Sequence, residues 1–256
     1  MLFKLNVKGS VISPYMRKKL DEFAYLASHD LQEPLRKIGT LSEFLRLRYH
    51  DALGKEGAQY IDMILSSVNN MRGIIDSLLQ FTDLDSKTPE FVPLKLNEVV
   101  ADVLADQQLK ISETGATIDV RPLPDVEGVA SEIRLLMNNL ISNSLKFVSG
   151  TKPNIKVESS PLDDHDKVKL KLTSPARFFK ISVSDNGIGF EKEFCELIFG
   201  VFQRLNAKSE YAGSGIGLAT CKKIADRHHS LIFAESELGK GSTFSLVIPE
   251  HQIANG

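Results

Sequence analysis

The segment SHDLQEPL, from Ser28 to Leu35, combines a histidine, an adjacent aspartate and a proline. Asp30 can hold one ring nitrogen of His29 by a charge-assisted hydrogen bond, which leaves the other nitrogen as a nucleophile. Pro34 removes one backbone hydrogen bond and is expected to bend the helix one turn beyond His29. An exposed His–Asp pair is usually only solvated charge, so these residues alone leave both interpretations open.

A second group of polar residues lies in NNLISNSLKF, which begins at Asn138. Asn139, Asn143 and Lys146 recur at i, i+4 and i+7 and therefore share one helix face. Carboxamide oxygens can bind a hard cation such as Mg²⁺, and the lysine can meet phosphate. An exposed polar surface is the simpler alternative, because asparagine is tolerated there.

Three glycine-containing segments follow. In DNGIGF, Asp185 ends a predicted strand, and Gly187 and Gly189 let the backbone turn close to a ligand, although an ordinary turn has the same pattern. GKGSTF, residues 239–244, is equally compatible with a plain hairpin.

In GSGIGL, three glycines open the predicted helix 216–227 and expose backbone N–H groups that suit an anion. They are Gly213, Gly215 and Gly217. The segment is neither a Walker loop nor a dinucleotide fingerprint, and by itself it is weak evidence.

The histidine segment belongs to a long helical pattern. From Pro14, apolar residues recur at alternating steps of four and three, as in a heptad seam. The first seam contains Leu20, Ala24, Ala27, Leu31, Pro34, Ile38, Leu41 and Leu45. After a break at 51–57, the second contains Ile61, Ile64, Val68, Met71, Ile75 and Leu78. We expect an antiparallel hairpin that pairs with a second copy in a dimeric four-helix bundle, with packing against the rest of the chain as the alternative. This register places His29 opposite the seam.

The remainder predicts an α/β layer, in which one sheet is faced by helices. Residues 87–93 contain two prolines and predict a linker. Helices are expected at 97–113, 130–146, 191–199 and 216–227. Strands are expected at 117–121, 154–159, 167–172, 179–185, 231–235 and 242–248. Residues 3–7 indicate a further short strand.

Composition excludes several classes of protein. The 256 residues are 42% hydrophobic and 25% charged, which suits one large or two modest domains. The net charge of −2 gives no basic surplus for nucleic acid or a membrane surface, and no apolar run approaches a membrane span. Cys195 and Cys221 lack metal-ligand spacing, which favours a reducing, cytoplasmic context.

Taken in order, the motifs resemble the transmitter core of sensor histidine kinases of two-component systems. SHDLQEPLR is similar to the H box of phytochrome-like and PAS-linked kinases, NNLISNSLKF to the N box and DNGIGF to the G1 box. IFGVFQR, GSGIGLA and GKGSTF are similar to the F box, the G2 box and the last glycine motif. The resemblance covers residues 15–249. It implies that an ATP-binding α/β sandwich of the Bergerat (GHKL) type follows the helical bundle along the chain.

The resemblance also implies roles for residues that bind or receive phosphate. His29 would be the phosphoacceptor, with Asp30 as its orienting partner and proton acceptor. Asn143 would bind Mg²⁺, with Asn139 beside the metal or the transferring phosphoryl group, and Lys146 would contact phosphate.

For the nucleotide, Asp185 would accept the adenine amino group, and Gly187 and Gly189 would give it room. Arg204 would reach the γ-phosphoryl group, and residues 205–212 would form a lid over ATP. The glycines implied to surround the phosphates are Gly213, Gly215 and Gly217.

The chain departs from the family pattern at three places. Glu33 stands where Thr or Asn is usual, at the position linked to phosphatase activity. His228-His229-Ser230 replaces His-Gly-Gly and is interpreted as structural. Val129 stands where an acidic residue is common in the family, and the sequence suggests no reason for this replacement.

We therefore expect ATP-dependent autophosphorylation of His29 and transfer to an aspartate of a separate response regulator. The expected divisions are a leader or the end of an upstream sensor domain (1–12), a dimerisation and phosphotransfer domain (13–88) and an ATP-binding domain (89–256). One alternative is a GHKL-type ATPase, but such enzymes carry a glutamate base where this chain has Asn139. The other is a catalytically silent dimeric scaffold, which would not need intact nucleotide motifs.

Overall fold

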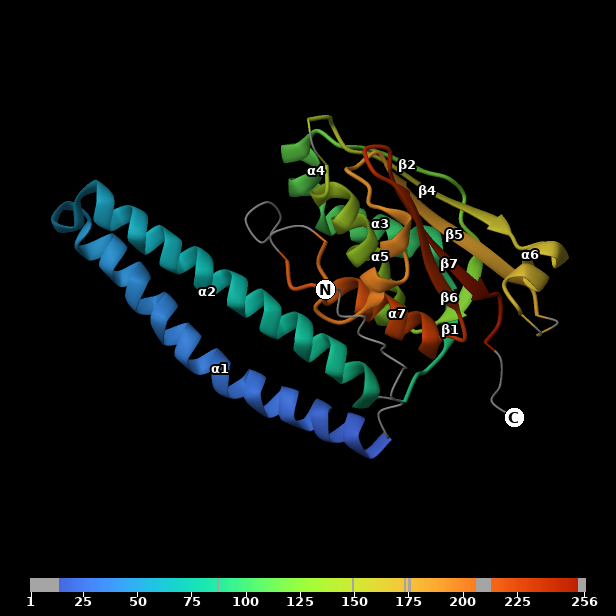
Figure 1. Ribbon diagram of the computed structural model, residues 1–256, viewed down its shortest axis with the longest axis horizontal. Helices are drawn as coiled ribbons and strands as arrows, with labels where there is room; N and C mark the ends of the chain where they lie inside the picture. Colours follow the sequence, from blue (N-terminus) through green and yellow to red (C-terminus); the bar gives the residue numbers. More distant parts are fainter. Residues whose placement is uncertain are drawn as a thin grey trace, which may run out of the picture. The chain divides into compact units, whose positions relative to one another are not determined.

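The structure, a computed structural model, describes residues 14–86, 88–148, 150–172, 174, 176–205 and 213–252, with side chains from Asp30 onward except that of Ser86. The chain divides between Ser86 and Lys87 into two units (Figure 1). The first is helical, and the second combines helices with a β-sheet. The predicted strand 3–7 and the predicted leader lie outside the described residues.

The first unit is a hairpin of α1 (Pro14–Arg48) and α2 (His50–Ser86). α1 continues through Pro34. The break predicted at 51–57 is narrower than expected, because residues on both sides of Gly54 are helical and only Gly54 departs, with φ at +62°. This left-handed conformation favours glycine, so one residue makes the interruption.

The hairpin core contains Leu35, Val68 and Ile75, which are 6%, 2% and 7% exposed. In α1 the contact stripe is Leu35, Gly39 and Ser42, all buried at helical spacing. The heptad seam predicted for α1 is therefore wrong as the surface that meets α2.

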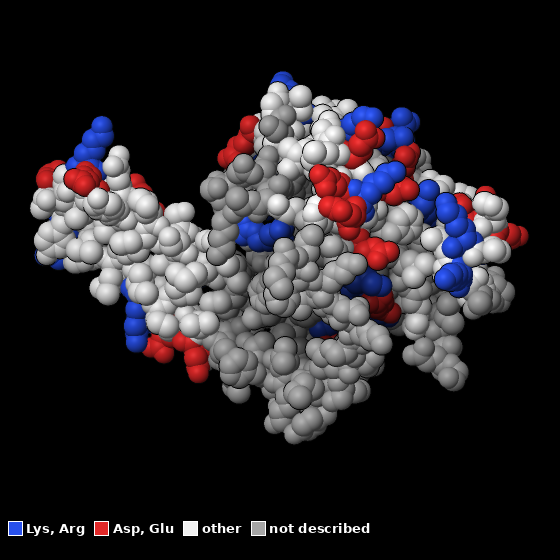
Figure 2. All heavy atoms as spheres, viewed as in Figure 1, with Lys and Arg blue, Asp and Glu red and all other residues white. Residues whose placement is uncertain are grey.

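Several predicted seam residues remain exposed within one chain. They are Leu31, Ile38, Leu41 and Leu45 of α1, and Ile64 and Met71 of α2. In the view of Figure 2, the middle of the hairpin presents mostly uncharged side chains. The hairpin thus buries one stripe of each helix and leaves a second apolar stripe to solvent.

The second unit contains a five-stranded sheet in the order β2-β4-β5-β7-β6. β2 and β4 are parallel, and the other pairs are antiparallel. Its strands are β2 (Thr117–Val120), β4 (Asn154–Pro161), β5 (Phe178–Asp185), β6 (Leu231–Glu237) and β7 (Gly241–Pro249). A separate antiparallel pair is formed by β1 (Val92–Lys95) and β3 (Asp125–Gly128).

Helices cover one face of this sheet (Figure 1). They are α3 (Leu96–Asp106), α5 (Ala130–Lys146) and α7 (Gly217–Arg227), with α4 (Gln108–Thr114) after α3. Leu136, Leu140 and Ile224 are at most 1% exposed between the helices and the sheet. The predicted helical hairpin followed by an α/β layer is confirmed. Over the second unit, basic and acidic side chains intermingle in the view of Figure 2, in keeping with the small net charge.

Four local predictions were wrong. The first half of the strand predicted at 167–172 is the end of helix α6 (Asp164–Lys169), and a turn follows it; the Asp163 carboxylate caps this helix by accepting from the Asp166 N–H. The helix predicted at 97–113 is interrupted at Gln107, and that at 191–199 is two 3₁₀ turns, η1 (Lys192–Phe194) and η2 (Leu197–Phe199). Strand β1 begins inside the predicted linker.

No helix in the described ranges is long and apolar enough to cross a membrane.

Candidate functional site

A pocket in the second unit gathers most of the residues that the sequence singled out. Its predicted members are Asn139, Asn143, Lys146, Asp185, Gly189, Arg204, Gly213, Gly215 and Gly217. They come from α5, the end of β5, the segment after η2 and the start of α7. The predicted residues that do not line it are Gly187, which shapes the turn beside it, and His29, Asp30 and Glu33, which belong to the other unit.

Asp185 places a carboxylate in the pocket wall at the end of β5. Its Oδ1 accepts from the backbone N–H groups of Gly187 at 2.9 Å and Ser242 at 3.2 Å. Its Oδ2 accepts from the Ser144 hydroxyl at 3.1 Å. Burial raises the pKa of Asp185, and these three donors oppose that rise. The carboxylate is therefore fixed in orientation, and Oδ2 keeps acceptor capacity for a ligand.

The turn after Asp185 requires glycine for reasons of space. A Cβ added at Gly187 would lie 2.3 Å from the Phe147 carbonyl oxygen and 2.8 Å from Asp185 Oδ1. At Gly189, where φ is +60°, it would lie 2.1 Å from the Glu237 carbonyl oxygen. A side chain at either position would displace the backbone that holds Asp185.

Lys146, at the last turn of α5, has an amino group with an unusually low pKa. Burial lowers its pKa to about 8, with smaller contributions from Arg204 and Lys110. Its Nζ lies 4.4 Å from the centre of the Phe147 ring. A Cβ added at Gly213 would lie 2.6 Å from the same Nζ. The amino group thus points toward the glycine segment that precedes α7.

That glycine segment lines the pocket close to α5. Arg204 donates from Nη1 to the Gly213 carbonyl oxygen at 2.7 Å. Gly215 has φ at +71°, and a Cβ added at Gly217 would lie 3.0 Å from Asn139 Oδ1. The predicted lid, residues 205–212, lies outside the described residues except for Leu205.

The pocket has the chemistry of a nucleotide site. The apolar side chains that line it include the five here called the apolar wall, namely Ile188, Phe190, Ile198, Leu218 and Phe244. Lys146 and Arg204 supply positive charge, and Asn139 and Asn143 supply carboxamide oxygens from one helix face. A flat base can occupy the apolar part with its polar edge at Asp185, and phosphates can occupy the cationic part.

Several residues of this site were not predicted from the sequence. Ser144 adjoins Asn143, but its role depends on α5 packing against β5, which the motif does not reveal. Ser242 follows the glycine of GKGSTF, a segment that was matched to the last glycine motif but given no residue with a role in the site. The apolar wall gave no signal, because single apolar residues are common in any core.

In the helical unit, the backbone at His29 lies within α1, and its side chain is outside the described atoms. Asp30 is exposed. Glu33 forms an i,i+4 ion pair with Lys37 at 2.7 Å, and both side chains are 64% exposed.

Comparison with known proteins identifies both units. Residues 19–87 match the His Kinase A (phospho-acceptor) domain. Residues 128–252 match the Histidine kinase-, DNA gyrase B-, and HSP90-like ATPase family. The chain carries the transmitter core of a sensor histidine kinase.

Individual relatives agree with this assignment. Cyanobacterial phytochrome A of Nostoc sp. is 37% identical over 231 residues, which are 90% of this chain and 28% of that protein. Full-length ShkA in complex with AMPPNP has a TM-score of 0.67 at 20% identity, over 92% of this chain and 47% of ShkA. ThkA in complex with the response regulator protein TrrA has a TM-score of 0.59 at 21% identity, over 91% of this chain and 64% of that chain. This transmitter core spans less than a third of the length of the curated phytochrome relatives.

Proposed function

We propose that this transmitter core is a protein histidine kinase, which phosphorylates His29 from ATP and passes the phosphoryl group to an aspartate of a response regulator. The observation that carries the proposal is the arrangement around Asp185. A half-buried carboxylate with a fixed orientation shares one pocket with apolar side chains and with the cationic side chains of Lys146 and Arg204.

In this proposal the adenine amino group donates to Asp185 Oδ2, and the base packs against the apolar wall. Lys146 and Arg204 contact the phosphates, and the backbone N–H groups at Gly213, Gly215 and Gly217 face them. The two carboxamide oxygens of Asn139 and Asn143 are suitable ligands for Mg²⁺, which would neutralise phosphate charge when bound.

The phosphoacceptor step then uses His29 and Asp30. The unprotonated ring nitrogen of His29 attacks the γ-phosphorus in line. A P–N bond forms, the bond to the bridging oxygen breaks, and ADP leaves. Asp30 takes the proton from the other ring nitrogen, which neutralises the imidazolium. A receiver domain as the next acceptor is supported by the response regulator in the ThkA complex.

We further propose that residues 13–88 form the dimerisation and phosphotransfer domain and 89–256 the ATP-binding domain, with 1–12 as a leader or the end of a sensor domain. The exposed apolar stripes of α1 and α2 support a homodimer, because a second copy would bury them. The free cysteines, one buried and one half-buried, fit the reducing cytoplasmic location that the sequence favours.

Two alternatives fit less well. A GHKL-type ATPase needs a base for water, and the Asn139 carboxamide is not basic. A silent scaffold needs no nucleotide pocket, whereas the polar groups around Asp185 are paired and oriented.

The test is incubation of the protein with γ-labelled ATP and Mg²⁺, after which one sample is treated with acid and another with alkali. We expect label that survives alkali and is lost in acid, which identifies phosphohistidine. His29→Gln should take up no label and keep the wild-type affinity for ATP, since the nucleotide pocket lies in the other unit. His165→Gln, which changes an exposed histidine of the second unit, is the matched control and should label normally. Stable label on His29→Gln would refute the phosphoacceptor assignment.

A further inference from the structure

Helices α5 and α7 contact each other through four pairs of residues, and the residue numbers rise along α5 as they fall along α7. From one end to the other, the contacting pairs are Val129–His228, Glu132–Arg227, Leu136–Cys221 and Asn139–Gly217. The helices are therefore antiparallel. The last pair belongs to the nucleotide pocket, and the first two lie at the far end.

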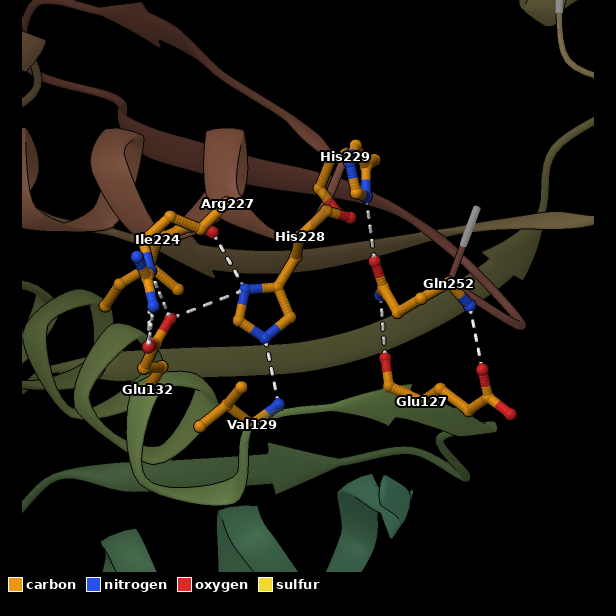
Figure 3. Close-up of polar contacts among 9 residues, drawn as sticks. Glu127, Val129, Glu132, Ile224, Arg227, His228, His229 and Gln252 are labelled. Carbon is orange, nitrogen blue, oxygen red and sulfur yellow. Dashed lines mark hydrogen bonds and ion pairs between the residues drawn. The ribbon is translucent and has the colours of Figure 1, made fainter. Parts of the chain in front are cut away.

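His228 makes the end-most connection. Its side chain is completely buried. Figure 3 draws the polar contacts of its ring. Nε2 accepts from the Val129 N–H at 3.0 Å, and Nδ1 donates to the Ile224 carbonyl oxygen at 2.9 Å. Because a backbone N–H can only donate, the ring must be neutral with its proton on Nδ1. One imidazole thus joins the start of α5 to the end of α7.

The next connection is a nearly buried ion pair. Arg227 donates from Nη2 to Glu132 Oε1 at 3.0 Å and from Nε to Glu132 Oε2 at 3.1 Å. The side chains are 16% and 9% exposed. Such a two-pronged pair fixes direction as well as distance, so it resists sliding of one helix along the other.

The His228 ring is also held by packing. The Phe91 ring meets it edge to face, with centroids 5.3 Å apart. A Cβ added at Gly128 would lie 3.4 Å from His228 Cδ2 and 3.1 Å from Leu94 Cδ1, so the ring fills the space beside β1 and β3. In Figure 3, Gln252 joins Glu127 of β3 to His229, which adds a second link at the same end.

We propose that His228, together with the Glu132–Arg227 pair, sets the axial register of α5 against α7 and thereby positions the nucleotide site at their other end. A helix rises about 1.5 Å per residue and transmits an axial shift along its length. A slip of that size is about half of the 3.0 Å that separates Asn139 Oδ1 from a Cβ at Gly217. His228 is in this view a positioning residue that never touches the nucleotide.

This inference rests on the proposed nucleotide site, and two substitutions separate the two bonds of His228. His228→Gln places an acceptor where Nε2 stands and keeps the bond from Val129. His228→Asn places a donor where Nδ1 stands, so it keeps the bond to Ile224 within its own helix and the 3.8 Å approach to Glu132 Oε2, but loses the bond from Val129. The measurement is the affinity of the full chain for a fluorescent ATP analogue with Mg²⁺, well below the melting temperature of every variant.

We expect His228→Asn to weaken binding roughly tenfold and His228→Gln to stay within about twofold of wild type. Val247→Ala is the matched control, because it opens the separate Leu162–Phe178–Val247 cluster and lowers Tm without touching α5 or α7. It should leave affinity unchanged. If His228→Asn does not fold, Arg227→Lys replaces it, since lysine keeps the charge but loses the two-pronged geometry, and a several-fold loss is expected.

Wild-type affinity in His228→Asn, or an equal loss in Val247→Ala at equal loss of Tm, would overturn the register proposal. A wild-type chain that binds no ATP analogue would instead refute the proposed function.

Discussion

Exchanging the acceptor at Asp185 for a donor should change which purine the pocket prefers. In Asp185→Asn, the two backbone N–H groups of Gly187 and Ser242 require an oxygen at the Oδ1 position. The amide nitrogen must therefore occupy the Oδ2 position. The Ser144 hydroxyl can rotate and accept from it, so the fold should persist.

The adenine amino group would then meet a donor instead of an acceptor. Hydrogen bonds to charged groups contribute about 1.5–3 kcal/mol, so affinity for ATP should fall roughly 10- to 150-fold. Inosine triphosphate carries a carbonyl oxygen where ATP carries the amino group. That oxygen can accept from the new amide, so the variant should bind ITP better than ATP, opposite to wild type.

The assay is competition of ATP and ITP against a fluorescent nucleotide analogue, for wild type, Asp185→Asn and Asp185→Ala. Asp185→Ala should weaken both nucleotides and prefer neither strongly, because it offers no polar group. A melting curve for each protein checks that the pocket is folded. An unchanged ATP-to-ITP ratio in Asp185→Asn would refute the placement of the base against this carboxylate.

Three further predictions follow from other parts of the molecule. Lys146 is charged below its pKa of about 8 and neutral above it, so affinity for ATP should fall as the pH rises through that value; Lys146→Arg should remove this pH dependence, and a wild-type affinity that is flat across the range would contradict it. Ile38→Asp with Ile64→Asp should give a folded monomer in light scattering, because both side chains are exposed in the single hairpin; Lys55→Asp, at an exposed position, is the control and should remain a dimer, and a monomeric wild type would count against the bundle. Glu33→Thr should speed the loss of label from a phosphorylated regulator, since a carboxylate repels the phosphoryl group; Lys37 partly offsets that charge, so Lys37→Ala should slow the loss, whereas strong wild-type activity lost in Glu33→Thr would make Glu33 the catalytic group.

The sequence alone predicted most of the polar residues and glycines that line the pocket, because their signals are local. Helical periodicity alone predicts that Asn139, Asn143 and Lys146 share one face, and α5 has the predicted bounds. The glycines around Asp185 and before α7 mark backbone conformations or close approaches that a side chain would prevent. Each of these requirements can be recognised from the residue type at a single position or from the spacing of a few neighbours.

What the sequence could not decide is which surfaces meet. Periodicity marks an apolar stripe but gives no partner for it, so the stripe of α1 that packs on α2 differs from the predicted seam. The segment 167–172 had apolar residues suited to a strand, but the Asp163 cap and the packing of Leu170 and Leu172 against the Leu162–Phe178–Val247 cluster accompany a helix and turn instead.

Pairings across long sequence separations belong to the tertiary structure alone. Ser144 reaches Asp185 only because α5 lies on β5, and His228 reaches Val129 only because α7 runs antiparallel to α5. That second bond also gives Val129 a role through its backbone N–H, which any residue except proline would supply. The type of side chain at position 129 therefore could not predict this bond. The buried imidazole of His228, which accepts from the Val129 N–H, is 99 residues away along the chain.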